Sequence, residues 1–338
     1  MYIKKRYGIL PTVKWSRSGL IMGSLSGTAA VILYDLAGLH WVAIPWQPVS
    51  LIGIALAFYL GFKNNSSYDR TWEARKIWGG IVNDSRSFGA MVVNYISNLH
   101  ATTPAPDEEI RVIKRKFIFN HLAWLTALRF QLRMPRPWEH INENLNRNFK
   151  NLQIPEFKSE MKKELSEFLD AEEISQLEGK TNVAAQLLFL QSRILNTIRQ
   201  KGLIDDFRHM EMQNMITRMF EGQGKSERIK NFPFPRQYAS ATHHLVIMFS
   251  ILLPFTLLEE FTVLGSYFIW LTVPFNALAS WVFLLMELIG DYSENPFEGT
   301  YNDIPITSIS RAIEIDLKEL LEEKDIPAPV TPVDDFLL

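Results

Sequence analysis

The stretch SLIGIALAFYLGFKNNSSYDRTWEARKIWGG, residues 50–80, changes character halfway, with no proline at the join. Its first half carries no charge, whereas its second half is basic and contains two tryptophans. The apolar half places large side chains four residues apart, at Ile54, Phe58 and Phe62. At about 100° per residue these positions drift only about 80° around a helix, so they form one stripe. We predict one continuous helix that passes from an apolar into a polar environment.

Long runs without Asp, Glu, Lys or Arg occur in pairs near both ends of the chain, at residues 18–34, 36–62, 239–258 and 262–286. A helix rises about 1.5 Å per residue, so about 20 apolar residues cross a roughly 30 Å hydrocarbon layer. The runs therefore predict four membrane helices, at about residues 18–38, 48–80, 239–258 and 262–289. The alternative is a set of buried core helices in a soluble all-α protein.

These helices divide the chain into four expected parts. They are an N-terminal segment with the first transmembrane hairpin, a helical cytosolic domain, a second hairpin, and a cytosolic helix with an extended proline-rich tail, at residues 1–62, 63–238, 239–290 and 291–338. Within the second part, residues 110–133 have the periodicity of an amphipathic helix. The fold class we expect is an all-α integral membrane protein.

Basic residues flank the first hairpin on both sides: Lys4, Lys5, Arg6, Lys14 and Arg17 precede it, and Lys63, Arg70, Arg75 and Lys76 follow it. Lysine and arginine concentrate on the cytoplasmic side of a membrane. We therefore expect a multi-pass protein of the cell inner membrane with cytoplasmic N- and C-termini. The second hairpin would turn on the outer side at Glu259 and Glu260.

Composition removes several classes of function. The net charge of −2, without a long basic stripe, gives no support to a nucleic-acid partner. The chain has no cysteine, which excludes disulfides and thiolate catalysis. We find no glycine-rich phosphate loop, no His–carboxylate metal motif and no Ser–His–Asp arrangement. The sequence therefore predicts no enzyme, no cofactor and no metal site.

Five motifs occur in an order and at separations that resemble the bacterial bestrophins: IALAFYLGF, NNSSYDRTWEARKIWGG, ALRFQLR, SERIKNFPFPRQY and ENPFEG, between residues 54 and 299. The resemblance implies a homopentamer whose subunits each give four transmembrane helices and a helical cytosolic domain around one axial pore. It implies a passive channel for monovalent ions, with chloride or other anions expected. The alternative is a membrane-anchored helical scaffold or signalling protein that conducts no ions.

The resemblance also implies where the pore narrows. The neck of the family would lie at Ile54, Phe58 and Phe62, although the spacing alone favours packing against a neighbouring helix. A second, cytosolic constriction would lie at Phe207, with Leu203 as the alternative. Acidic residues near both mouths would attract cations, or would be ordinary solvated charges: Glu259, Glu260, Asp205 and Asp206.

The calcium clasp of eukaryotic bestrophins would follow the NPF motif of residues 295–297. Here only Asp303 stands where an aspartate ligand is needed, and Thr300 replaces another. Calcium prefers six to eight oxygen ligands, several of them carboxylates. We therefore expect no calcium activation. We expect Asp291, Glu294 and Glu298 to form a solvated charge cluster.

Overall fold

The computed structural model describes residues 1–140 and 154–338, and regular structure in these residues is helical apart from isolated bridges near the termini. The chain divides into two compact units. The apolar unit comprises Lys4–Thr71 and Pro233–Glu294, and the polar unit comprises Met1–Ile3, Trp72–Phe232 and Asn295–Leu338. The all-α prediction is confirmed for the described residues.

The apolar unit contains the helices that are long and apolar enough to cross a membrane. In the described residues there are four such candidate spans, at Arg17–Leu36, His40–Tyr95, Arg236–Thr262 and Ser266–Asp291. Its helices are α1 (Ile9–Trp15), α2 (Arg17–Val31), the first part of α3 (Trp46–Tyr95), α9 (Arg236–Thr262) and α10 (Thr272–Asp291). Short π and 3₁₀ turns extend α2 to Leu36 and precede α10 at Ser266–Leu271.

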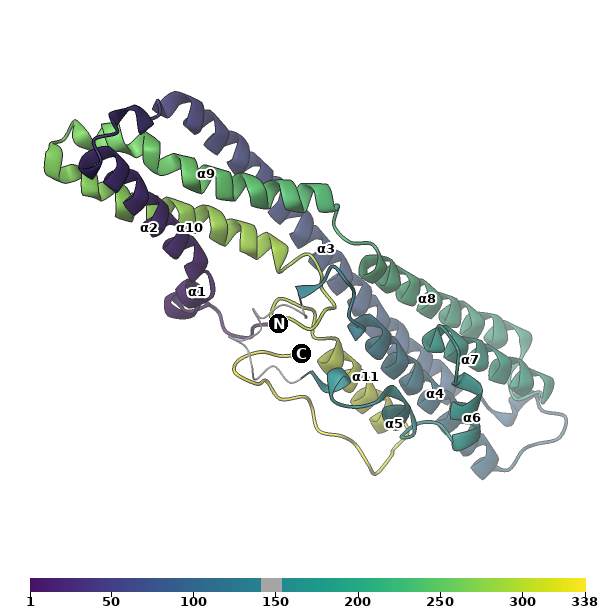
Figure 1. Ribbon diagram of the computed structural model, residues 1–338. Helices are drawn as coiled ribbons and strands as arrows, with labels where there is room; N and C mark the ends of the chain where they lie inside the picture. The colour runs from purple at the N-terminus through teal and green to yellow at the C-terminus, as the bar shows by residue number, and fades with distance from the viewer. Residues whose placement is uncertain (141–153) are drawn as a thin grey trace. The chain divides into compact units, whose positions relative to one another are not determined.

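Close packing of α2 on α10 depends on glycines spaced four residues apart. A Cβ atom added at Gly23 would lie 2.7 Å from the Cα of Ala277, and one at Gly19 would lie 2.9 Å from the Cα of Trp281. No real Cβ contact is that short, so only glycine lets the two backbones approach this closely. Figure 1 shows α2 and α10 running alongside each other. The Asn276 side-chain amide fastens the pair by donating to the Gly23 carbonyl at 2.7 Å.

Helix α3 is longer than the sequence predicted. It runs unbroken for 50 residues and ends at Tyr95, whereas we expected an end near residue 80. The pair Gly79 and Gly80 does not stop it, because a helical glycine costs only about 1 kcal/mol. Trp78 and Ile81 beside the glycines are buried in the core of the polar unit and hold the backbone helical.

The helix predicted at residues 110–133 is α4 (Asp107–Arg133), and the polar unit is built around it. Every residue from Phe117 to Phe130 is buried, so the middle of α4 is enclosed on all sides and not on one stripe only. The other helices of this unit surround it with the second part of α3: α5 (Met161–Leu165), α6 (Ala171–Leu177), α7 (Val183–Gln200), α8 (Asp206–Asn231) and α11 (Ile306–Leu320). The segment after α11 has no helix, and its last carbonyl, at Leu338, accepts from Ser308 N–H at 2.7 Å.

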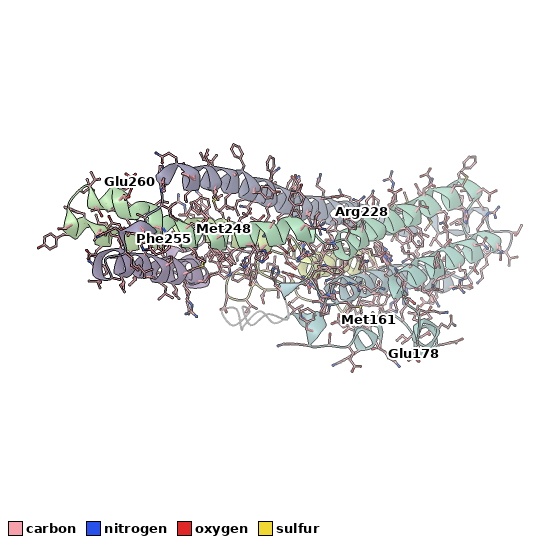
Figure 2. All side chains as sticks on the ribbon, turned by 45° about the horizontal axis from the view of Figure 1, so that its top comes forward. Met161, Glu178, Arg228, Met248, Phe255 and Glu260 are labelled. Atoms are coloured by element: carbon pink, nitrogen blue, oxygen red, sulfur yellow. The ribbon has the colours of Figure 1, made fainter. Side chains whose placement is uncertain are left out.

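Two expectations about charged residues were wrong. Glu259 and Glu260 do not form a link: they lie in the last turn of α9, exposed, and Figure 2 shows Glu260 near the end of that helix beyond Met248 and Phe255. Glu294 and Glu298 are fully buried and not solvated. Glu294 accepts from Arg236, and Glu298 accepts from the backbone N–H of His140 at 3.0 Å, so partners replace the water that we expected.

Candidate functional site

One face of α3 is buried along almost the whole helix. The members recur every three, four or seven residues and lie within about 80° of one another at 100° per residue. They are Val49, Leu56, Leu60, Lys63, Ser67, Ala74, Trp78, Ile81, Ser85, Phe88 and Val92. In the apolar unit this stripe packs against residues of α9 and α10, including Val246, Phe249 and Leu284. We call it the packing stripe.

A second face of α3 is exposed at every helical repeat. Its members are Leu51, Ile54, Phe58, Phe62, Asn65, Asp69, Trp72, Lys76, Gly80, Asn83, Ser87, Ala90 and Asn94. The mean direction of Ile54, Phe58 and Phe62 is about 170° from that of Leu56, Leu60, Lys63 and Ser67. The chain therefore packs α3 on one side and leaves the opposite side open. We call it the open face.

The three predicted neck residues belong to the open face. Ile54 is 56% exposed, Phe58 is 67% exposed and Phe62 is 69% exposed. Within this chain they therefore do not pack against a neighbouring helix, which was the alternative that their spacing suggested. Large apolar side chains left in the open need another cover, which is lipid, another subunit or a restricted path.

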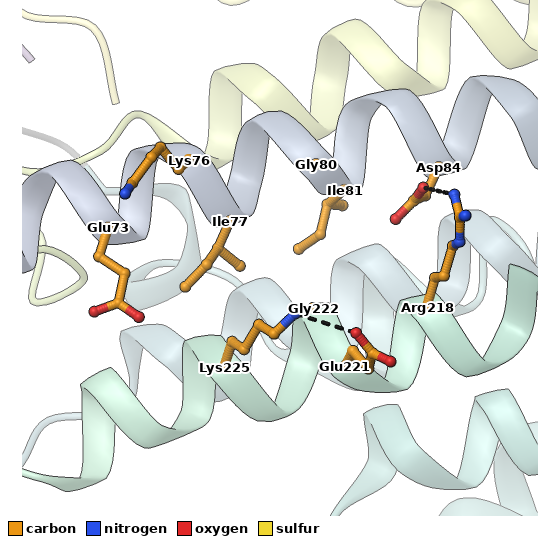
Figure 3. Close-up of a pocket in the computed structure, with 10 residues that line it drawn as sticks. All are labelled: Glu73, Lys76, Ile77, Gly80, Ile81, Asp84, Arg218, Glu221, Gly222 and Lys225. Atoms are coloured by element: carbon orange, nitrogen blue, oxygen red, sulfur yellow. Dashed lines mark hydrogen bonds and ion pairs between the residues drawn. The ribbon is translucent and has the colours of Figure 1, made fainter.

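Beyond Phe62 the open face is polar or small apart from Trp72. A groove of about 440 Å³ lies beside it, between α3 and α8 (Figure 3). Lys76 and Gly80 of the open face line this groove. Its other charged side chains are largely paired: Arg218 lies 3.7 Å from Asp84, and Lys225 lies 3.1 Å from Glu221. The groove therefore presents hydrated charge of both signs beside the open face.

The two candidates for a second constriction differ sharply in exposure. Leu203 is 1% exposed and belongs to the core of the polar unit. Phe207, in the first turn of α8, is 83% exposed. Only Phe207 reaches the surface of the subunit, so the alternative at Leu203 has no structural support.

The predicted vestibule charges at the start of α8 have structural tasks. Asp205 caps α8 by accepting from Arg208 N–H at 3.0 Å, and this bond holds the pKa of the carboxyl below its usual value. Asp206 accepts from Arg199 at 2.6 Å, which also lowers the pKa of Asp206. Both remain anionic at neutral pH.

Asp303 is committed to the protein and not to an ion. One oxygen accepts from Arg133 at 2.8 Å and from Gly299 N–H, and the other accepts from the Thr300 hydroxyl at 2.8 Å. Nearby, burial raises the pKa of Glu298 to about 7, against the opposing effect of His140. Within the described residues no group of three His, Asp or Glu side chains is placed to hold a metal.

Sequence reasoning missed a buried ion pair that begins at the residue after Phe62. We treated Lys63 as a cytosolic flanking charge, but it lies on the packing stripe, and its Nζ donates to Glu287 of α10 at 2.8 Å. Both residues are 2% exposed. The signal was present, since Lys63 directly follows Phe62 and Glu287 directly follows an uncharged run of 25 residues at 262–286.

Comparisons with known proteins agree with the motifs. A family model for the bacterial/fungal bestrophin protein matches residues 18–319. The voltage-dependent anion channel-forming protein YneE of Salmonella typhi is 29% identical over 315 residues, covering 93% of this chain and 90% of that protein. A voltage-dependent anion channel-forming protein of Ralstonia nicotianae is 30% identical over 291 residues, covering 85% and 82% of the two chains.

Solved structures share the fold. A bacterial bestrophin homolog from Klebsiella pneumoniae matches with a TM-score of 0.74 at 23% identity, covering 91% of this chain and 98% of that chain. The ordered motifs, the four candidate membrane helices and the matched family model lead to one conclusion: this chain belongs to the bacterial and fungal bestrophin family.

Proposed function

We propose that this chain is the subunit of a passive ion channel, a homopentamer in which the open face of α3 lines an axial pore. The observation that carries the proposal is the open face itself. It continues for the length of a 50-residue helix, and it changes from apolar to polar at Phe62. A pore that leads from an apolar neck into a hydrated vestibule requires this order of side chains.

In the proposed assembly Ile54, Phe58 and Phe62 form three apolar rings. An ion that enters such a ring loses hydration water and gains no charged ligand, so the rings limit conduction by dewetting. The positive edges of the phenylalanine rings partly offset this cost for an anion. Phe207 forms the second, cytosolic constriction, supported by its exposure at the start of α8.

We propose monovalent anions, chloride among them, as the permeating ions. Support comes from the relatives, which are named as anion channel-forming proteins. The neck rings do not by themselves choose a sign of charge, and exposed Glu259 and Glu260 would favour cations at one mouth. Reversal potentials in asymmetric salt decide between anions and the alternative, cations.

The proposed site of action is the cell inner membrane, with both termini in the cytoplasm. Residues 1–62 and 239–290 provide the two membrane hairpins, and residues 63–238 and 291–338 are cytosolic. The lysines and arginines that precede α2 support this orientation. The partners are other copies of this chain, the lipid bilayer and the permeating ions, with no cofactor.

Purified protein in lipid vesicles tests the proposal. Chloride flux above that of empty vesicles is expected from the wild-type protein. The rival function, a membrane-anchored helical scaffold or signalling protein, gives no flux above empty lipid. Cross-linking and mass measurement in detergent test the pentamer separately, so an assembled but silent pentamer would favour the scaffold.

A further inference from the structure

Lys63 is a basic residue, yet it lies in the packing stripe of α3, between Leu60 and Ser67. Taking a lysine and a carboxylate out of water is costly even when they pair. An apolar residue at position 63 would pack more cheaply. The pair therefore needs a reason beyond stability.

The surroundings of Lys63 join three helices of the apolar unit. Its Nζ lies 2.8 Å from Oε1 of Glu287 and 3.4 Å from Oδ1 of Asp291, one turn further along α10. From α9, Nδ1 of His243 lies 3.8 Å from the same Glu287 oxygen. One lysine thus faces two carboxylates. Lys63 has no spare positive charge to offer a passing anion, so it does not select ions directly.

The position of Lys63 relative to the neck suggests its task. It follows Phe62 directly, and successive residues are about 100° apart around a helix. Leu56 and Leu60 pack α3 against the neighbouring helices by apolar contact, and such contact tolerates sliding and rotation of the helix. The hydrogen bond from Lys63 to Glu287 at 2.8 Å adds a directional link between α3 and α10 at this level.

We infer that the Lys63–Glu287 ion pair is a positioning device for the neck: it fixes the rotation of α3 against α10 so that Phe62 stays on the open face. This inference rests on the proposed function, because the pair acts on conduction only if Phe62 lines the path. Lys63 and Glu287 are positioning residues that contact no permeating ion.

Thiol labelling reads this rotation without relying on conduction. The chain has no cysteine, so Phe62→Cys introduces a single reactive site. We expect its rate of reaction with a water-soluble thiol reagent, in assembled protein, to fall at least about fivefold when Lys63→Met or Glu287→Gln is added, because α3 is then free to populate other rotations. The charge swap Lys63→Glu with Glu287→Lys restores the rate, which a role in packing alone would not predict.

The matched control is Lys225→Met, which breaks the exposed Lys225–Glu221 pair of α8 and should leave the labelling rate unchanged. If the single variants fail to fold, Lys63→Met with Glu287→Leu replaces both charges by apolar groups that the core tolerates. Slow labelling in that double variant supports the inference.

The inference is overturned if Lys63→Met or Glu287→Gln leaves the labelling rate of Phe62→Cys unchanged. It is also overturned if the charge-swapped protein is labelled as slowly as these neutral variants. Flux through vesicles made with unmodified protein is measured in parallel. If that protein does not conduct, the proposed function fails, while the labelling rates still decide whether the pair sets the rotation of α3.

Discussion

The two halves of the open face of α3 share one helix and one packing stripe but differ in chemistry. From Leu51 to Phe62 the exposed side chains are large and apolar, and from Asn65 to Asn94 they are mostly polar or small. The packing stripe continues through both halves, but its partners differ: the first half packs in a cluster with residues of α9 and α10, and the second half packs in the core that contains α4. Under the proposed function, this difference places the barrier to ions in the first half, while the second half needs only to stay hydrated.

The largest effect on flux is expected when the large apolar side chains of the first half are replaced by small ones. We expect Ile54→Ala, Phe58→Ala and Phe62→Ala together to raise chloride flux through vesicles at least about tenfold, equal to about 1.4 kcal/mol of barrier, because water fills a wider neck. The flux is normalised to the amount of assembled oligomer.

The matched control is alanine at Leu25, Ile251 and Phe275, three exposed apolar residues of α2, α9 and α10. It removes comparable side chains from other surfaces and should leave the flux unchanged. Equal effects of both triple variants would contradict a neck on α3.

A second prediction concerns the pH dependence of stability that arises from His121, a packing partner of the second half. The hydroxyl of Ser85, in the second half of the packing stripe, lies 2.9 Å from Nε2 of His121, and burial lowers the pKa of His121 to about 3. The unfolded chain has a histidine pKa of about 6.5, so between these values the unfolded state binds more protons. The free energy of unfolding should therefore fall by about 1 kcal/mol from pH 7 to pH 5.5 because of His121.

Denaturant unfolding at the two pH values measures this loss, and His121→Gln should reduce it. His209→Gln, which removes a partly exposed histidine of α8, is the control and should keep the wild-type slope. Identical slopes in wild type and His121→Gln would show that His121 does not carry the pH dependence.

Single substitutions sharpen the boundary between the halves. We expect Phe62→Ser to raise flux about threefold, because one ring becomes wettable. Asn83→Leu, which adds an apolar residue to the second half, should change flux by less than about 1.5-fold, since one apolar ring in a wide hydrated vestibule does not exclude water. An equally large effect at Asn83 would move the barrier out of the first half.

The smallest effect is expected at the second constriction. Phe207→Ala should raise flux by up to about twofold, because Phe207 would form a single ring in the proposed assembly and not three in series. Leu203→Ala is the contrasting variant: it creates a cavity in the core and should lower the free energy of unfolding by about 2–5 kcal/mol. A larger flux change from Leu203 than from Phe207, in folded protein, would contradict the assignment.

The sequence predicted the helical class, the four apolar segments and the stripe of Ile54, Phe58 and Phe62, because these depend on local periodicity. It did not predict the length of α3, since the core residues Trp78, Ile81 and Ser85 hold the helix beyond Gly79 and Gly80 only through tertiary contacts. It mistook Glu294 and Glu298 for solvated charges, because their partners Arg236 and His140 are distant in sequence.

Chemical modification of a conducting channel distinguishes the two faces of α3 most directly. Single cysteines are placed at Asn83 on the open face and at Ala74 on the packing stripe, and a negatively charged thiol reagent is added from the cytosolic side during chloride flux. The account predicts that the reagent reduces flux through the Asn83→Cys channel and leaves the Ala74→Cys channel unaffected. Unaltered flux after complete labelling of Asn83→Cys would contradict a pore lined by the open face.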